Sequence, residues 1–262
     1  MFGRQLVSVF LALAAIAVAH ADSKVNARAR VFAKLPDWTG LWQSEGWWPL
    51  DLAGRPVGGE ARLQQSLQTI RPPPYNAEWQ ETYQKAQSDS AAIAERVKTF
   101  KVCERTFPQL MEAPWMFQVA VLPEETLIVF ENGQVRHVYT DGRAHSAAED
   151  LWPTPLGESV GHWEGGTLVI DTIARVAEPL GPRAWFSVLS EQAHFTERLR
   201  RIGNDELEDE LVIEDPVMLA RPWRMTLRFK RLADMRRMIA VNCTDNDRNP
   251  VVDGELKITV PK

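Results

Sequence analysis

Short segments in which apolar and polar residues alternate dominate the chain from residue 116 onward. In the clearest of them, residues 223–230, Trp, Met, Leu and Phe occupy every other position between Arg, Thr, Arg and Lys. This pattern predicts a strand with one face buried and the other in water. The expected inward residues are Trp223, Met225, Leu227 and Phe229, and the expected outward residues are Arg224, Thr226 and Arg228.

The other alternating segments follow one another with turn residues between them. They lie at 116–121, 126–130, 135–139, 160–164, 167–172, 194–201, 207–214 and 235–241. With a first strand after the turn at residues 37–40, the series makes about ten strands in antiparallel order, and a meander of this length commonly closes into a barrel. We therefore expect a mainly β protein, with residues 22–262 forming a single antiparallel barrel domain.

One long segment, residues 76–100, has helical periodicity instead. Asn76 is a suitable N-cap, and Trp79 and Tyr83 fall on one face of the helix. After a weak point near residues 89–90, a second set of apolar residues follows at helical spacing. We expect this main helix to pack against the barrel.

Two hairpin turns allow side chains to be assigned to faces. The dipeptide Asn132-Gly133 favours a two-residue type I′ turn. Counting outward from such a turn places one set of side chains on a common face that is otherwise apolar. Its members are Ile128, Phe130, Val135, His137 and Tyr139.

The second turn, Gly165-Gly166, sets Glu164 opposite Thr167 and His162 opposite Val169. Because side chains alternate along a strand, His162, Glu164, Thr167 and Asp171 should project from one face. Trp163, Leu168 and Ile170 should take the opposite, apolar face.

The Gly165-Gly166 register makes His162 and Asp171 diagonal neighbours on adjacent strands. A carboxylate beside an imidazole fixes its tautomer and raises its basicity, as general-base catalysis requires. We expect His162 and Asp171 to act as a catalytic pair beside a barrel cavity, with His137 and Tyr139 on the opposite wall. The structural alternatives are an exposed salt bridge for His162 and Asp171 and a hydrogen-bonded core role for His137.

Aromatic and charged residues near these strands are candidate ligand contacts, because Trp side chains suit flat apolar molecules. The candidates are Trp42, Trp115, Arg143, Trp163 and Glu164.

The N-terminus has the features of a secretory signal peptide at residues 1–21. Arg4 precedes an apolar run at residues 6–18, which is shorter than the roughly 20 residues of a transmembrane helix, and Ala19-His20-Ala21 fits a cleavage site. We expect a mature periplasmic or secreted protein that begins at Asp22 and has no transmembrane segment.

The charge of the chain and its motifs argue against several classes of partner and cofactor. The formal net charge is −5 and the basic residues are scattered, which argues against nucleic acid. We find neither a glycine-rich phosphate loop nor histidines at metal-ligand spacing, and therefore expect neither a nucleotide cofactor nor a metal. The oligomeric state is not indicated.

Two cysteines, Cys103 and Cys243, remain after the signal peptide. An even number of cysteines in an oxidising compartment favours a disulfide between them. Two buried free thiols are the alternative.

Residues 135–143 and 157–172 carry the motifs VRHVYTDGR and GESVGHWEGGTLVIDT. They resemble a family of uncharacterised secreted bacterial proteins with R-x-I-Y-T-D-G-R and G-x-S-x-G-x-W-E-G-D-T-L-V-V-D-T segments. The resemblance covers most of residues 100–245 and departs at Gly166, where the family usually has Asp. It implies a shared fold more than a reaction. Gly40-Leu41-Trp42 is also similar to the G-x-W that opens lipocalin (calycin-like) barrels.

Two functions fit these features. The first is an exported, cofactor-independent acid/base enzyme, a lyase or isomerase acting on a small apolar substrate that is aromatic or terpenoid. The second is a lipocalin-like binding protein in which the same polar groups only orient an apolar ligand. Paired ionisable groups on one strand face favour the enzyme, and the lack of a known catalytic signature favours the binding protein.

Overall fold

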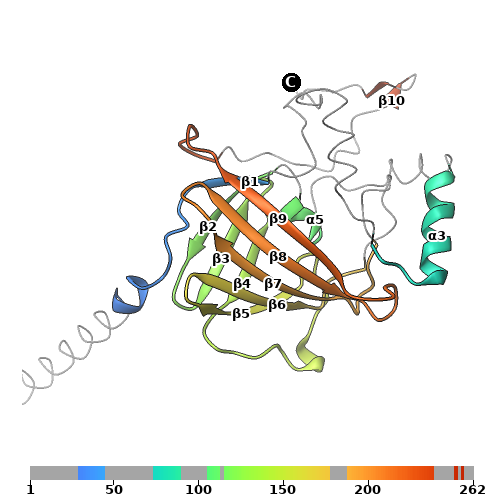
Figure 1. Cartoon of the computed structure of the whole chain (residues 1–262), viewed down its shortest axis with the longest axis horizontal. Coiled ribbons are helices and arrows are strands. Elements are labelled where there is room, and N and C mark those ends of the chain that lie inside the picture. The colour runs from blue at the N-terminus through green and yellow to red at the C-terminus, as the bar shows by residue number, and fades with distance from the viewer. Residues whose placement is uncertain are drawn as a thin grey trace, which may run out of the picture.

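Nine strands close into a mainly antiparallel β-barrel in the computed structural model (Figure 1). Residues 29–44, 73–89, 105–112, 115–177 and 188–238 are described, together with the backbone of 251–252 and 255–256. In chain order the barrel strands are β1 (Leu41–Ser44), β2 (Met116–Val121), β3 (Glu125–Phe130), β4 (Val135–Tyr139), β5 (Glu158–Glu164), β6 (Thr167–Ile173), β7 (His194–Arg201), β8 (Glu206–Glu214) and β9 (Trp223–Arg231). A separate two-stranded sheet comprises β10 (Val251–Val252) and β11 (Glu255–Leu256).

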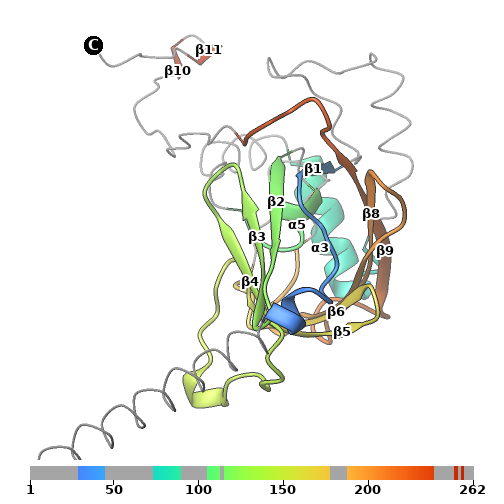
Figure 2. The same cartoon turned by 90° about the vertical axis from the view of Figure 1, so that its left-hand side faces the viewer.

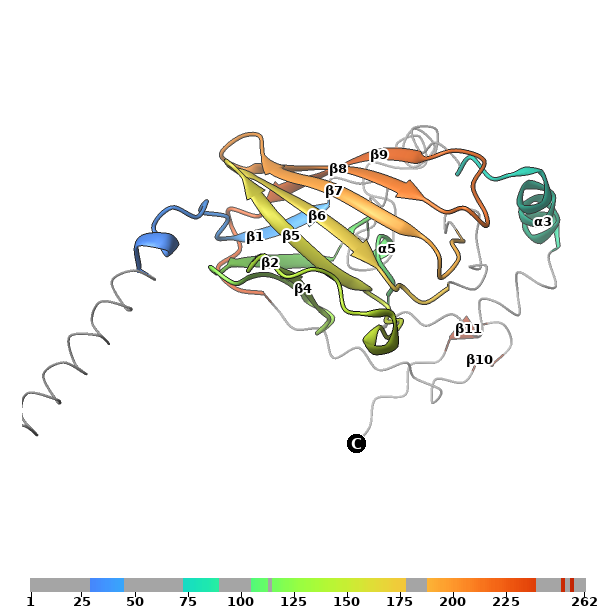
Figure 3. The same ribbon diagram turned by 90° about the horizontal axis from the view of Figure 1, so that it is seen from below.

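The expected barrel is confirmed, but the expectation of purely antiparallel order is wrong at one place. β4 and β5 pair in parallel, through Val138 with Ser159 and Tyr139 with Val160. Strand direction cannot alternate all the way around a closed ring of nine, so at least one neighbouring pair must be parallel. The pair overlaps briefly because β5 begins beside the point where β4 ends. The connecting segment, residues 140–157, loops outside the ring and includes the 3₁₀ turn η1 (Ala148–Asp150) (Figure 3).

The turn at Asn132-Gly133 differs from the predicted two-residue hairpin. Val129 pairs with Val135, and the amide of Gly133 donates to the carbonyl of Phe130 at 3.0 Å. Gly133 has a positive φ of 88°, whereas Asn132 does not, so the turn is not type I′. The register therefore moves by one residue, which exchanges the two faces of β4.

This shift corrects the predicted shared face. Ile128 and Phe130 point into the barrel as expected, but they are joined from β4 by Arg136 and Val138. Val135, His137 and Tyr139 lie on the outer face instead. A charged residue thus enters the interior where the sequence pattern had predicted an apolar one.

The Gly165-Gly166 hairpin forms as predicted, with Glu164 opposite Thr167 and His162 opposite Val169. In β9 the alternation is also confirmed: Trp223 and Phe229 are buried, while Arg224 and Arg228 are exposed. The segment predicted as a last strand at 235–241 is not a strand over residues 235–238, and its remainder lies outside the described residues.

The main helix begins where the sequence predicts. In α3 (Ala77–Ser88), the Asn76 side chain accepts a hydrogen bond from the amide of Trp79 at 3.1 Å. Trp79 and Tyr83 pack against the core, as expected. Residues 90–100 of the predicted helix lie outside the described part of the chain, as do Cys103 and Cys243.

The buried core lies inside the barrel and extends to the segment that precedes β2. This segment contains α5 (Gln109–Glu112) and contributes Phe107, Leu110 and Met111. Figure 2 shows α5 behind β1 and β2. None of the helices in the described part of the chain is long and apolar enough to cross a membrane.

Candidate acid/base site

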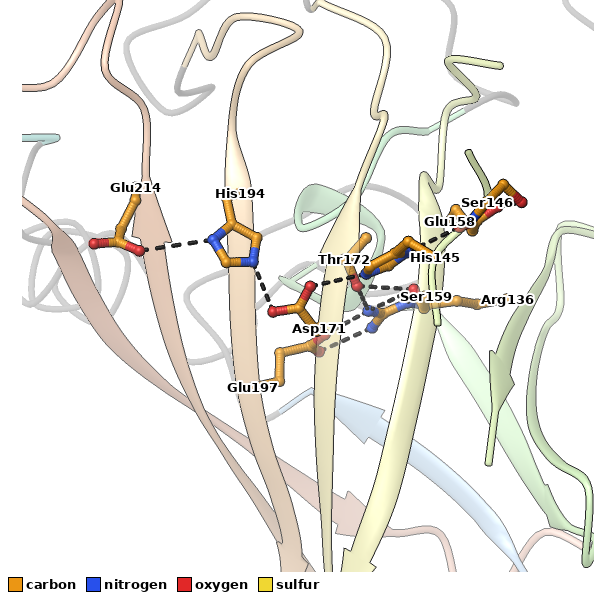
Figure 4. A network of polar contacts seen from close by, with 10 residues as sticks. All are labelled: Arg136, His145, Ser146, Glu158, Ser159, Asp171, Thr172, His194, Glu197 and Glu214. Carbon is orange, nitrogen blue, oxygen red and sulfur yellow. Dashed lines mark hydrogen bonds and ion pairs between the residues drawn. The ribbon is translucent and has the colours of Figure 1, made fainter. Parts of the chain in front are cut away.

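Asp171 lies between two histidines on the outer face of the barrel (Figure 4). Its Oδ1 is 2.8 Å from Nε2 of His145, and its Oδ2 is 2.6 Å from Nε2 of His194. One carboxylate therefore holds two imidazoles, one through each oxygen. We call Asp171, His145 and His194, together with Glu158 and Glu214, the outer cluster.

Strand geometry brings these residues together. Asp171 pairs with Thr196 on β7, so His194, two residues earlier, is its diagonal neighbour on the same face. His145 arrives from the segment between β4 and β5. Glu158 at the start of β5 anchors that segment, because its carboxylate accepts hydrogen bonds from the amide of Ser146 at 2.8 Å and from its hydroxyl at 2.6 Å.

The second nitrogens of the two histidines differ in their surroundings. Nδ1 of His145 is 2.9 Å from Oε1 of Glu158, within hydrogen-bonding distance. Nδ1 of His194 is 3.6 Å from Oε2 of the exposed Glu214, which is too far for a hydrogen bond. His194 therefore keeps one ring nitrogen free of hydrogen bonds to the described residues.

Glu158 is held in its ionised form. Burial alone would raise the pKa of this carboxyl, but hydrogen bonds from Ser146 and His145 outweigh burial and lower it. An ionised carboxylate only accepts hydrogen bonds. Both ring nitrogens of His145 lie within hydrogen-bonding distance of a carboxylate, Nδ1 close to Glu158 and Nε2 close to Asp171.

The outer cluster replaces the predicted pair of His162 and Asp171. Both residues are on the outer face, as the hairpin register implies, but His162 is 64% exposed and contacts Glu164 at 3.3 Å. Asp171 is occupied by His145 and His194 instead. The expected direct hydrogen bond between His162 and Asp171 is therefore not formed, since Asp171 contacts His145 and His194 and His162 contacts Glu164.

His137 and Tyr139 do not form the opposite wall of a cavity. With the corrected register they lie outside the barrel, where His137 Nδ1 is 3.0 Å from Glu125 Oε2 and the two rings stack at 6.2 Å. Arg143 places its guanidinium 4.1 Å above the ring of Tyr139 and pairs with Asp141. These residues form a separate surface group.

The other predicted ligand contacts are spread over the barrel. Trp42 is fully buried, and its indole donates to the carbonyl of Trp38 at 3.0 Å. Trp163 points inward as predicted and packs edge-on against Trp38 at 5.1 Å. Glu164 pairs with Arg198 at 2.8 Å on the outer face, and Trp115 is half-buried ahead of β2.

A second polar network lies inside the barrel, directly behind the outer cluster. Arg136 pairs through both terminal nitrogens with Glu197, and both side chains are buried. The guanidinium also donates to Thr172 Oγ1 at 2.9 Å and lies 3.9 Å above the ring of Phe107. Ser159 completes the network, with its hydroxyl 2.8 Å from that of Thr172.

Asp209 is the second buried acid of the interior. Its two carboxyl oxygens have no hydrogen-bond partner among the described residues. Burial raises its pKa well above the usual range, and the nearby charge of Glu197 raises it further, against a smaller opposing effect of Arg136. The raised pKa favours the protonated form of Asp209, whereas Glu197 is paired with Arg136.

Sequence reasoning found Asp171 but missed its partners. His145 lies in a long connection with no periodicity, and His194 follows another long connection whose length does not fix the register of β7 against β6. The missed signal for Arg136 was the glycine of the 132–133 turn, because a single positive-φ residue also suits a three-residue hairpin loop. Among the described side chains, no group of three or more His, Cys, Asp or Glu residues is arranged to hold a metal ion.

Comparison with known proteins adds no further guide to this site. No family model, no curated protein and no solved structure matches the chain.

Proposed function

We propose that the protein is an exported, cofactor-independent acid/base enzyme, a lyase or isomerase, whose general base is His194. The observation that carries the proposal is the 2.6 Å contact of His194 Nε2 with Asp171, combined with an Nδ1 that makes no hydrogen bond to the described residues. A carboxylate that accepts a hydrogen bond from Nε2–H holds the proton on that nitrogen and leaves the Nδ1 lone pair free to take a proton from a substrate.

The rest of the outer cluster supports proton transfer. The imidazolium that forms on His194 would be stabilised by Asp171 on one side and by Glu214 on the other. His145, held between Asp171 and Glu158, fixes the position of the Asp171 carboxylate that orients His194. In an isomerisation, the proton that His194 Nδ1 removes is returned to another carbon of the substrate; in an elimination, the leaving group departs with its electron pair and the imidazolium then loses the proton to solvent. Neither step requires an organic cofactor.

The substrate class proposed is a small apolar compound, aromatic or terpenoid. Trp152 supports this class, because it is 76% exposed and belongs to the same connecting segment as His145. An exposed indole offers a flat apolar face next to a segment that carries a reactive group.

Proton exchange tests the proposed base directly, because it requires only the first proton transfer of the reaction. Small aromatic and terpenoid ketones would be incubated in D₂O with the mature protein, and loss of the α-proton would be followed by NMR. We expect exchange with the wild type and a reduction of about 10²–10⁴-fold in His194→Ala. His162→Ala is the matched control, because it removes an exposed histidine of the same sheet. Equal exchange rates for His194→Ala and the wild type would refute His194 as the base.

A carrier for an apolar small molecule is the second candidate. It is favoured by polar atoms of the barrel interior that have no hydrogen-bond partner among the described residues: the indole nitrogens of Trp38 and Trp163, the hydroxyl of Thr126 and the carboxyl of Asp209. A bound ligand with one polar group could satisfy some of them. Saturable quenching of tryptophan fluorescence by compounds that undergo no exchange would support this function over the enzyme.

We also propose export and processing as the sequence indicates: cleavage after residue 21, a periplasmic or extracellular location, and a disulfide between Cys103 and Cys243. Membership of the family of secreted bacterial proteins with the matching motifs is part of the same proposal.

A further inference from the structure

We infer that Arg136 is the positioning residue of the outer cluster: from inside the barrel, its guanidinium sets the spacing of Glu158, Asp171 and His194 on the outside. The inference rests on the proposed function, since it assigns Arg136 a part in the same site. Arg136 touches none of the proposed reacting groups and acts through the strands that carry them.

The two networks are joined back to back through consecutive residues. On β5, Glu158 points outward to His145 and Ser159 points inward to Arg136. On β6, Asp171 points outward to both histidines and Thr172 points inward to Arg136. Ser159 and Thr172 are also register partners. A displacement of either hydroxyl would therefore move the adjacent carboxylate of the outer cluster.

Arg136 bridges β4 and β5, the neighbouring barrel strands with the fewest paired backbone positions. The parallel junction of β4 and β5 has only two paired positions, compared with seven between β5 and β6. From β4, the guanidinium reaches Ser159 on β5, Thr172 on β6 and Glu197 on β7 (Figure 4). One side chain thus ties together the three strands that carry Glu158, Asp171 and His194.

Burial makes these contacts of Arg136 strong and fixed in geometry. A buried bidentate pair of Arg and carboxylate is held in one geometry, and loss of one partner leaves an uncompensated charge. Glu197 accepts hydrogen bonds from both terminal nitrogens of Arg136, one through each carboxylate oxygen. Phe107 covers the guanidinium and limits its movement. The hydroxyls of Ser159 and Thr172 consequently meet a donor in a fixed position.

The test uses Thr172→Val in the mature protein, because Val keeps the β-branched shape and replaces the hydroxyl with a methyl group that cannot hydrogen-bond. The matched control is Thr126→Val, the same change at another buried, inward-facing barrel position whose hydroxyl has no hydrogen-bond partner among the described residues. Arg136→Lys is the stronger variant. The readouts are the imidazole ¹⁵N shifts of His145 and His194, which report the tautomer, and kcat and KM for proton exchange.

In Thr172→Val we expect the single-tautomer signature of His194 to be lost and kcat to fall by about tenfold, a fraction of the 10²–10⁴ expected for the base itself. KM should change less. The shifts of the exposed His162 and all readouts of Thr126→Val should stay at wild-type values. If Arg136→Lys does not fold, Thr172→Val alone decides the question.

The outcomes separate this inference from the proposed function. Altered shifts of His194 together with reduced exchange support both. Altered shifts in a protein whose wild type shows no exchange support the positioning role and refute the enzyme. Unchanged shifts in folded Thr172→Val and Arg136→Lys would overturn the inference, whatever the activity of the wild type.

Discussion

The two nitrogens of His194 have different surroundings, and this difference defines its proposed role. Nε2 is held by Asp171, while Nδ1 faces Glu214 at a distance that allows attraction without a hydrogen bond. His145, by contrast, is held at both nitrogens. The two histidines on one carboxylate thus differ: His194 has a ring nitrogen that makes no hydrogen bond to the described residues, whereas both ring nitrogens of His145 contact carboxylates.

Removal of the Asp171 charge tests this difference. In Asp171→Asn the amide can accept from one histidine but presents a donor to the other, so the tautomers of His145 and His194 can no longer both be satisfied. We expect proton exchange to fall by about 10²–10⁴-fold, with a small change in Tm because the residue is partly exposed. A fall in Tm that accounts for all of the lost activity would indicate a structural salt bridge instead.

Asp209 makes a residue-scale prediction about stability and pH. Its pKa is raised in the folded protein above the ordinary value of 3.8, so the folded state binds the proton more tightly than the unfolded state. The free energy of unfolding should therefore fall as the pH rises from about 3.8 toward the raised pKa, by about 1.4 kcal/mol for each pH unit between those two values.

Asp209→Asn removes this titration. Urea midpoints of the wild type and the variant should differ by a constant amount below the ordinary pKa of 3.8 and should diverge in favour of the variant as the pH increases. Parallel curves from about pH 3 to about pH 8 would show that Asp209 does not change its protonation between the folded and unfolded states.

At the scale of the elements, the two hairpins show what local sequence can and cannot determine. Gly165-Gly166 predicted the correct register, and with it the faces of β5 and β6. Asn132-Gly133 suits two loop lengths, and the structure has the longer one. The pattern of β4 could not decide between them, because its alternation of Val, Arg, His, Val and Tyr has no clearly apolar face. Burial of Arg136 depends on Glu197, which lies far away in the sequence.

Because β4, β5 and β6 are closely packed behind the outer cluster, substitution of two glycines by Ala should have very different effects on stability. One is Gly161 in β5 and the other is Gly166 in the turn after it. A Cβ at Gly161 would lie 2.7 Å from the carbonyl oxygen of Val169 and 3.0 Å from a methyl of Val138, whereas one at Gly166 meets nothing within 4 Å. We expect Gly161→Ala to destabilise the barrel by about 1–3 kcal/mol. Gly166→Ala should be nearly neutral. Thermal unfolding of the two variants measures the difference, and equal Tm values would contradict the packing.

For the whole molecule, the barrel, most of its strands and the inward face of β9 could be predicted because they depend on alternation and turns. The parallel junction could not be predicted from those signals, since it arises from ring closure. The outer cluster could not be predicted either. His145 lies in the long connection between β4 and β5, and His194 follows the long connection between β6 and β7. Asp171 alone was identified, through the one turn that fixed its face.

Export makes a prediction that concerns the whole chain. The mature protein should begin at Asp22 and contain a Cys103–Cys243 disulfide, which would close a loop of about 140 residues and constrain the unfolded chain. Intact mass under denaturing conditions, with and without reduction before alkylation, measures both. Two thiols that alkylate without reduction would rule out the bridge, and an uncleaved N-terminus would rule out processing.

The short parallel junction between β4 and β5 also has a consequence for how the barrel unfolds. A ring of strands that opens must separate at one seam, and the seam with the fewest backbone hydrogen bonds separates at the lowest cost. Here that seam borders β5, the strand that carries Glu158, lies one strand away from Asp171 on β6, and is bridged by Arg136. Water would reach the Arg136–Glu197 pair in the same event. Unrolling of the barrel and dismantling of the outer cluster would then be one cooperative step, and amide hydrogens of β4 should exchange with solvent before those of β7 and β8.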